Sequence, residues 1–287
     1  MKYIIEPKNI TQFRKLLKNA KVTDIMVGLE ELSSGLIFKM NLDTLNNYLG
    51  KLNSSIISLK ITRIFHEEEL KNLKEILSKL KWEKIKFIFY SDLGVYKIIK
   101  EWGYQDKLVY DANTYMTNAD DVNAFSSLNK YVVVSNQIAY SEIEKLLSKV
   151  KQPVIIYGFG KSIIFYSKRP LLKNYFLYRN LHYKYDEKNY YLKEEYRNDF
   201  YHFYEDQYGS YLYEPKFCYL YDELNKLQKV DYAIISCVDM KTSLFEKVVN
   251  GYLNDDSSFI SLCYDILYKG IMKEKSVLLK DEVTNNG

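Results

Sequence analysis

The sequence predicts an α/β fold, a TIM-like (β/α)8 barrel with a small β-rich insert between the seventh and eighth strands. The chain has 287 residues, of which 47% are hydrophobic, and this length suits one α/β barrel. Short apolar runs alternate with amphipathic segments at a repeat of roughly 25 to 30 residues. Such alternation is typical of parallel strands joined by helices, with the strands buried on both faces.

Eight segments are expected to be the barrel strands, because each is short, apolar and rich in β-branched or aromatic residues: 3–5, 24–28, 54–61, 86–90, 108–110, 131–134, 154–157 and 232–236. Five segments with apolar residues at helical spacing are expected to be helices: 10–18, 67–80, 95–102, 140–150 and 243–252.

Residues 160–222 differ from the rest in composition: they are rich in Tyr, Lys and Glu and show no clean helical repeat. Segments 190–193 and 203–211 indicate a β ribbon with a glycine turn. We therefore expect seven βα units in 1–159, a Tyr-rich insert in 160–222, the last βα unit in 223–270 and a polar tail in 271–287. The insert should stand at the carboxyl face of the barrel, where barrel enzymes keep their chemistry.

Gly160-Lys161-Ser162 ends like a phosphate-binding P-loop, but its surroundings exclude that function. Ile155 stands where the loop needs its first glycine, and the residues after Ser162 favour a strand instead of the required helix. We expect a strand, a turn and a second strand here.

Bulk properties exclude several classes of protein. No apolar run reaches the roughly 18 residues of a membrane span, and the N-terminus lacks a signal-peptide pattern, so a cytoplasmic location without membrane contact is expected. Three widely spaced cysteines favour neither a disulfide framework nor a zinc site, and no metal is expected. The net charge of +4 permits an anionic partner without requiring one.

Polar clusters follow several expected strands: SDLGV at 91–95, DANTYMTN at 111–118, SN at 135–136, YG at 157–158 and YSKRPLL at 166–172. The residues of these motifs and their order along the chain resemble the collagenase-like peptidase family (peptidase family U-32). The resemblance continues through EDQYGSYL at 205–212, KFC at 216–218, the stretch 234–241 and the segment 248–252. It covers roughly residues 20 to 255 and rests on the shared order of these motifs.

The departures from the family pattern concern its cofactor. Tyr157 stands where the family has a histidine, and Arg169-Pro170 replaces its Arg-Cys. Only Cys218 has a counterpart among the family's cysteines, so the four-iron cluster of some members, which needs thiolate ligands, is expected to be absent.

The resemblance implies a function in RNA modification. It points to a short family member that acts in tRNA wobble uridine 5-hydroxylation, with prephenate as the linked metabolite. A longer, cluster-bearing relative is then the expected heterodimer partner, and tRNA the expected nucleic acid. A collagenase-like peptidase and a non-catalytic scaffold remain alternatives, so whether the chain is an enzyme stays open.

The residues themselves give little support to proteolysis. The three histidines have no H-E-x-x-H spacing, no serine sits in a G-x-S-x-G elbow, and the cysteines lack a flanking signature. Catalytic residues are therefore not assigned.

The candidate ligand-binding residues are polar side chains at expected strand ends and in the insert: Asp92, Asn113, Asn118, Tyr157, Ser167, Arg169, Glu205 and Lys241. Arg169 is preferred, since a guanidinium suits a carboxylate or phosphate. Its alternative is an ion pair with Glu205 or Asp206. The alternative for Asp92 is a helix N-cap, and Asn118 and Ser167 could serve turns.

The candidate RNA-binding residues mix aromatic and cationic side chains of the insert: Tyr183, Lys184, Tyr190, Lys193 and Arg197. Exposed aromatics can stack on unpaired bases, and cations can neutralise phosphate. The alternative is a tyrosine-lined ribbon packed on the barrel, with nearby acids offsetting the basic charge.

Overall fold

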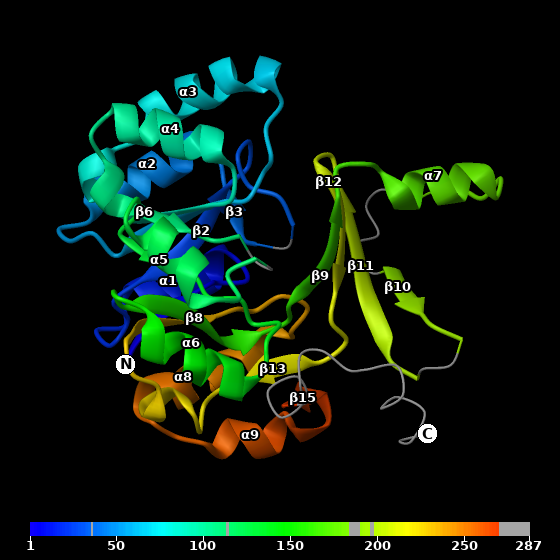
Figure 1. Cartoon of the computed structure of the whole chain (residues 1–287). Coiled ribbons are helices and arrows are strands. Elements are labelled where there is room, and N and C mark those ends of the chain that lie inside the picture. The colour runs from blue at the N-terminus through cyan, green and yellow to red at the C-terminus, as the bar shows by residue number, and fades with distance from the viewer. Residues whose placement is uncertain (36, 113–114, 184–189, 196–197, 270–287) are drawn as a thin grey trace.

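The computed structural model describes residues 1–35, 37–112, 115–183, 190–195 and 198–269. It has a mixed α/β fold with a large, mostly parallel sheet (Figure 1). All eight expected strands are present, with ends shifted by a few residues: β1 (Lys2–Ile5), β2 (Ile25–Leu29), β4 (Ile57–Ile61), β5 (Ile85–Tyr90), β6 (Leu108–Tyr110), β7 (Tyr131–Val132), β8 (Val154–Gly160) and β14 (Val230–Ile235).

These strands pair in parallel in the order β8-β14-β1-β2-β4-β5-β6-β7. An isolated parallel bridge between Val133 and Ile155 then links the end of β7 to β8, where the Val134 amide donates to the Ile155 carbonyl at 2.9 Å. Three short strands add to the sheet: β3 (Lys39–Met40) beside β2, β13 (Phe217–Tyr219) antiparallel to the end of β8, and β15 (Leu267–Tyr268) beside β13.

Helices follow most strands: α1 (Ile10–Leu17), α2 (Leu42–Lys51), α3 (Leu70–Ser78), α4 (Leu93–Glu101), α5 (Ala119–Ser126), α6 (Tyr140–Lys149), α8 (Thr242–Asn254) and α9 (Ser258–Leu262). Four of them begin at a side-chain cap, Asn9, Asn41, Asp92 or Asn118, which accepts a hydrogen bond from an otherwise unpaired backbone amide. Helices α2, α5 and α9 were not expected from the sequence, and the expected helix at 67–80 begins as a 3-10 turn.

Both faces of the parallel strands are buried, and neighbouring residues divide between two cores. Ile4 belongs to an inner cluster with Phe89, Ile155 and Ile234, whereas Ile5 packs in the larger core that the helices cover. This division follows from the two-residue period of a strand. It also explains why the strands read as continuous apolar runs.

The chain that connects β8 to β14 forms a separate antiparallel sheet beside the large one, in the order β10-β11-β12-β9 (Figure 1). Its strands are β9 (Ile163–Ser167), β10 (Tyr190–Lys193), β11 (Phe200–Asp206) and β12 (Gly209–Tyr213). Gly209 starts β12 with φ of +151°, and a Cβ there would lie 2.4 Å from the Ser167 carbonyl oxygen, so the β9–β12 contact requires glycine.

Residues 160–222, expected to be a Tyr-rich β insert without a clean helical repeat, also carry a helix, α7 (Leu171–Tyr178), which projects from the end of the small sheet (Figure 1). The Glu205 carboxylate on β11 accepts hydrogen bonds from the amides of Leu172 (2.8 Å) and Lys173 (3.2 Å). A residue far along the chain thus caps this helix. Strand β13, also within 160–222, pairs with the large sheet instead. The tail expected at 271–287 lies outside the described residues.

Candidate functional site

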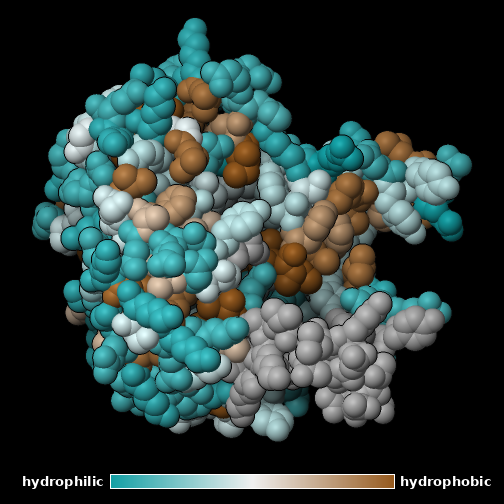
Figure 2. Space-filling view, in the orientation of Figure 1, coloured by the Kyte–Doolittle hydropathy of each residue, from teal (hydrophilic) through white to brown (hydrophobic). Residues whose placement is uncertain are grey.

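A cavity of about 510 Å³ lies between the carboxyl ends of the parallel strands and the small sheet. Its floor comes from β1, β4, β6 and β8 and the residues directly after them, and one wall comes from β9 and β12. Figure 2 shows apolar surface on the small sheet, whose exposed residues include Ile164 and Phe165 of the cavity wall. The volume falls within the usual range for small-molecule sites.

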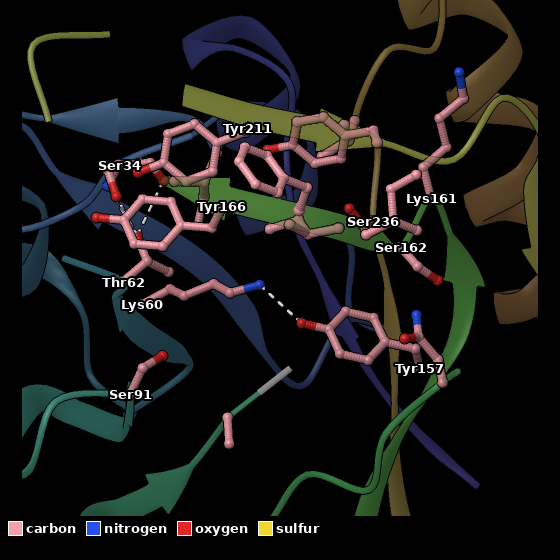
Figure 3. A pocket seen from close by; sticks show the side chains of 18 of the residues that line it. Ser34, Lys60, Thr62, Ser91, Tyr157, Lys161, Ser162, Tyr166, Tyr211 and Ser236 are labelled. Atoms are coloured by element: carbon pink, nitrogen blue, oxygen red, sulfur yellow. Dashed lines mark hydrogen bonds between the residues drawn. The ribbon is translucent and has the colours of Figure 1, made fainter. Parts of the chain in front are cut away.

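The floor carries a buried network centred on Lys60 (Figure 3). Its ammonium donates to Glu6 Oε1 at 2.9 Å and to Tyr157 Oη at 3.0 Å. The Tyr157 hydroxyl in turn donates to Asp111 Oδ2 at 3.0 Å. The side chains of Lys60, Glu6 and Asp111 are only 12%, 3% and 3% exposed, so two carboxylates share one ammonium group away from water.

The network fixes the protonation of Lys60 and Tyr157. Burial alone would lower the pKa of Lys60, but Glu6, Tyr157 and Asp111 outweigh it and raise the pKa well above its usual value. Burial, reinforced by the Asp111 carboxylate, raises the pKa of Tyr157 well above its usual value. At neutral pH the floor therefore presents an ammonium beside a neutral phenol, both hydrogen-bond donors.

A second ion pair joins Lys161 to Asp239, with Nζ and Oδ2 2.6 Å apart. His202 Nδ1 lies 3.7 Å from the same carboxylate, and the Tyr191 hydroxyl donates to it at 3.3 Å. Lys161 lines the cavity. The lysine of the P-loop-like triplet therefore pairs with the Asp239 carboxylate and is not held free for a phosphate. As expected, Gly160-Lys161-Ser162 connects two strands, β8 and β9, with no helix after it.

Hydroxyls and aromatic rings complete the cavity. The hydroxyl-bearing wall residues include Ser34, Thr62, Ser91, Ser162 and Ser236. The aromatic wall residues are Tyr110, Tyr115, Phe165, Tyr166, Tyr211 and Tyr213. Figure 3 shows Tyr166 and Tyr211 side by side near Ser34 and Thr62, with Lys60 extending toward Tyr157 beneath them; the two ring centroids are 5.0 Å apart. The arrangement offers flat apolar walls with polar groups at their edges.

Tyr157 is the one described member of the eight candidate ligand residues that lines the cavity. Asp92 caps α4 through Gly94 N (2.7 Å) and also accepts from Phe65 N (2.9 Å), the alternative given for it. Asn118 caps α5. Asn113 lies outside the described residues.

The other candidates surround the small sheet or the last unit. Arg169 is exposed and its amide donates to Ser167 Oγ at 3.1 Å. Glu205 is engaged by α7 and by the hydroxyls of Ser210 (2.6 Å) and Tyr183 (3.1 Å), so it holds the fold of the small sheet together. Lys241 is exposed at the start of α8.

Two of the RNA candidates form a packed cluster with α7. Tyr183 and Tyr190 place their rings 5.5 and 5.4 Å from Phe176. Lys193 is exposed with its ammonium over the Phe200 ring at 5.5 Å. Lys184 and Arg197 lie outside the described residues. The most exposed aromatic side chain of the small sheet and α7 is Tyr178, at 84%.

Sequence reasoning missed Lys60 and Glu6, and it quoted Asp111 without choosing it. A signal existed for Lys60, because it is the one charged residue in the apolar strand run SSIISLKI. A charge in a strand buried on both faces requires a buried partner.

The sequence profile of peptidase family U32 matches residues 9–254, and the chain belongs to this family. Among individual relatives, the tRNA hydroxylation protein P2 of Bacillus subtilis (strain 168) is 24% identical over 176 residues. That match covers 60% of this chain and 57% of the relative, a little over half of its length. A solved structure described as "The Structure of the U32 Peptidase Mk0906" covers 82% of this chain and 93% of its own, at a TM-score of 0.45 and 12% identity.

Within the part of the chain that the structure describes, no helix is long and apolar enough to cross a membrane. No group of three or more His, Cys, Asp or Glu side chains among those residues could hold a metal ion.

Proposed function

We propose that this protein takes part in RNA modification, as a subunit of tRNA wobble uridine 5-hydroxylation. The observation that carries the proposal is the match to a tRNA hydroxylation protein within the same family. Prephenate as the linked metabolite, tRNA as the nucleic acid and a longer, cluster-bearing relative as the partner subunit belong to the same proposal, as does a cytoplasmic location.

The fold part of the proposal is a closed TIM-like (β/α)8 barrel with its insert between β8 and β14. It is supported by the unbroken parallel pairing, the Val133–Ile155 bridge and the apolar cluster on the inner face of the strands. In such barrels the chemistry lies at the carboxyl ends of the strands, which is where the cavity opens.

The cavity floor supplies hydrogen-bond donors that are fixed before any ligand arrives. The Lys60 ammonium can polarise a carbonyl oxygen. The buried carboxylate of Glu6 holds it in place directly, and that of Asp111 does so through the Tyr157 hydroxyl. Donors that are already oriented cost little reorganisation during a reaction.

The cysteines do not fit the four-iron cluster found in some family members. The described residues offer three thiols, Cys218, Cys237 and Cys263, and all are buried. Burial raises the pKa of the Cys218 thiol to about 12, which disfavours the thiolate that iron requires. A cluster in the reaction would then belong to the partner subunit.

The test is nucleoside mass spectrometry of total tRNA from a strain that lacks the gene, grown with limited oxygen. We expect 5-hydroxyuridine derivatives to fall and to return with the wild-type gene. Tyr157→Phe should restore them poorly, because Asp111 loses its donor. Lys15→Met, at an exposed pair with Glu246, should restore them fully. An unchanged profile in a strain that also lacks any paralogue would exclude the role.

The same strain separates the alternatives. A scaffold would be required as a protein yet tolerate both Tyr157→Phe and Arg169→Ala. A peptidase would cleave gelatin as the purified protein and lose that activity on a single substitution in the cavity.

A further inference from the structure

We infer that the cavity receives an uncharged planar ring, a pyrimidine base turned out of its RNA strand, and that it does not bind the dicarboxylate metabolite of the reaction. The identity of the polymer as RNA rests on the proposed function. The charge and shape of the ligand rest on the cavity itself.

The fixed charges of the cavity leave no surplus positive charge for an anion. Lys60 faces the carboxylates of Glu6 (2.9 Å) and Asp111 (3.9 Å), and Lys161 faces Asp239 (2.6 Å). Two ammonium groups therefore meet three carboxylates. A dicarboxylate would add two negative charges to a buried site whose cations are already neutralised, and none of the described residues that line the cavity is an arginine that could pair with it.

The hydrogen-bonding groups suit a neutral ligand with carbonyl oxygens. An ammonium has three N–H donors, and Lys60 directs one to Glu6 and one to Tyr157. Asp111 at 3.9 Å is too far for the third, which is left for a ligand oxygen. The hydroxyl of Ser162, a residue 3% exposed on the cavity wall, has no hydrogen-bond partner among the described residues. A pyrimidine base carries oxygens on its edge that can accept the remaining N–H of Lys60.

The walls favour a flat ring over a peptide. Tyr166 and Tyr211 stand together on one wall, and the exposed ring of Tyr115 also lines the cavity. Enzymes that act on a base turn it out of the strand, stack it between apolar or aromatic side chains and bind its edge by hydrogen bonds. A peptide backbone would use the same donors, but it has no ring of its own to stack on these faces.

Ligand-observed NMR titrations of the purified chain test this with four probes: uridine, uridine 5′-monophosphate, prephenate and the tripeptide Gly-Pro-Gly. We expect uridine to bind, its monophosphate to bind within about twofold of it, and prephenate to bind at least about tenfold more weakly. Tighter binding of prephenate, or displacement of uridine by the tripeptide, would overturn the inference.

Matched variants locate the binding. Tyr166→Leu removes a ring that is 36% exposed and should weaken uridine binding at least about fivefold, whereas Tyr166→Phe keeps the ring and should stay within twofold. Tyr178→Leu, 84% exposed on α7 and outside the cavity, should bind as the wild type does. Melting curves show that each variant is folded. Uridine binding unchanged in Tyr166→Leu would refute the assigned site.

Failure here and failure of the proposed function can be told apart. A strain that loses 5-hydroxyuridine while the purified chain binds no uridine would retain the function and refute the cavity assignment. If the purified chain binds uridine but the tRNA profile of the deletion strain is unchanged, the cavity assignment stands and the proposed function is refuted.

Discussion

Replacing Lys60 by methionine should destabilise the protein far more than replacing an exposed lysine. The substitution keeps most of the aliphatic chain and removes the ammonium, so Glu6 and Asp111, each 3% exposed, are left buried without their cation. Breaking a buried ion pair by removing one partner costs about 3–5 kcal/mol of unfolding free energy. The phenol of Tyr157 also loses its donor.

Lys15→Met is the matched control. Lys15 and Glu246 are 2.7 Å apart, but their side chains are 62% and 35% exposed. Such a surface pair contributes roughly 0–1 kcal/mol. Urea unfolding at pH 7, followed by the fluorescence of the two tryptophans, measures both variants under the same conditions.

The double variant Lys60→Met/Glu6→Gln removes both charges of the closest pair. If the loss in Lys60→Met arises from an uncompensated carboxylate, the double variant should be at least about 1 kcal/mol more stable than the sum of the single losses predicts. Additive losses, or a Lys60→Met cost no larger than that of Lys15→Met, would refute the reasoning from the buried network.

Three further outcomes are expected. Gly209→Ala should cost about 2–3 kcal/mol, because its Cβ would meet the Ser167 carbonyl oxygen at 2.4 Å; Gly103→Ala, with positive φ but open space, should cost less, and equal melting temperatures would contradict this. Burial raises the pKa of Glu214 from 4.5 to about 7, so in that window the folded state holds a proton that the unfolded state releases. Stability from this group is therefore present at low pH and falls as pH rises, by up to roughly 3 kcal/mol. Glu214→Gln should melt above the wild type at pH 8 and near it at pH 4; the same gap at both pH values would exclude the mechanism. Finally, the three buried thiols should react with Ellman's reagent at pH 8 only in urea, since burial raises the pKa of Cys218 to about 12; rapid labelling of the native protein would contradict this.

The parallel strands could be predicted because a strand buried on both faces needs an unbroken apolar run. Strands such as Val154–Gly160 and Val230–Ile235 show that signal with no help from distant residues. Helix α2 was missed although Leu42, Leu45 and Leu49 have helical spacing, because the asparagines between them and Gly50 after them weaken the local preference for a helix.

Helix α7 could not be predicted in the same way. Its eight residues, LLKNYFLY, are apolar on most sides and none of them is buried, so no contrast between an apolar and a polar face marks it as a helix packed on a core. Its first turn is held by Glu205, more than thirty residues further along the chain, which no local pattern reveals.

The site was only partly visible in the sequence. Tyr157 and the cluster containing Asp111 were found because polar residues at the ends of parallel strands collect at one edge of a sheet. That Lys60 reaches Glu6 and Tyr157 depends on the register between β1, β4 and β8, which is set by the three-dimensional pairing.

The place where the small sheet joins the chain has an evolutionary consequence. Strands β8 and β14 are direct hydrogen-bonded neighbours, and β13, which follows the small sheet, also pairs with β8, so the small sheet leaves the large sheet and returns to it at the end of β8. Because the ends of that excursion are already held together, lengthening or exchanging it adds little loop-closure entropy. Evolution can therefore replace the small sheet, which forms one wall of the cavity, while the charged floor around Lys60 is kept. Related chains could bind new ligands after exchange of this one segment.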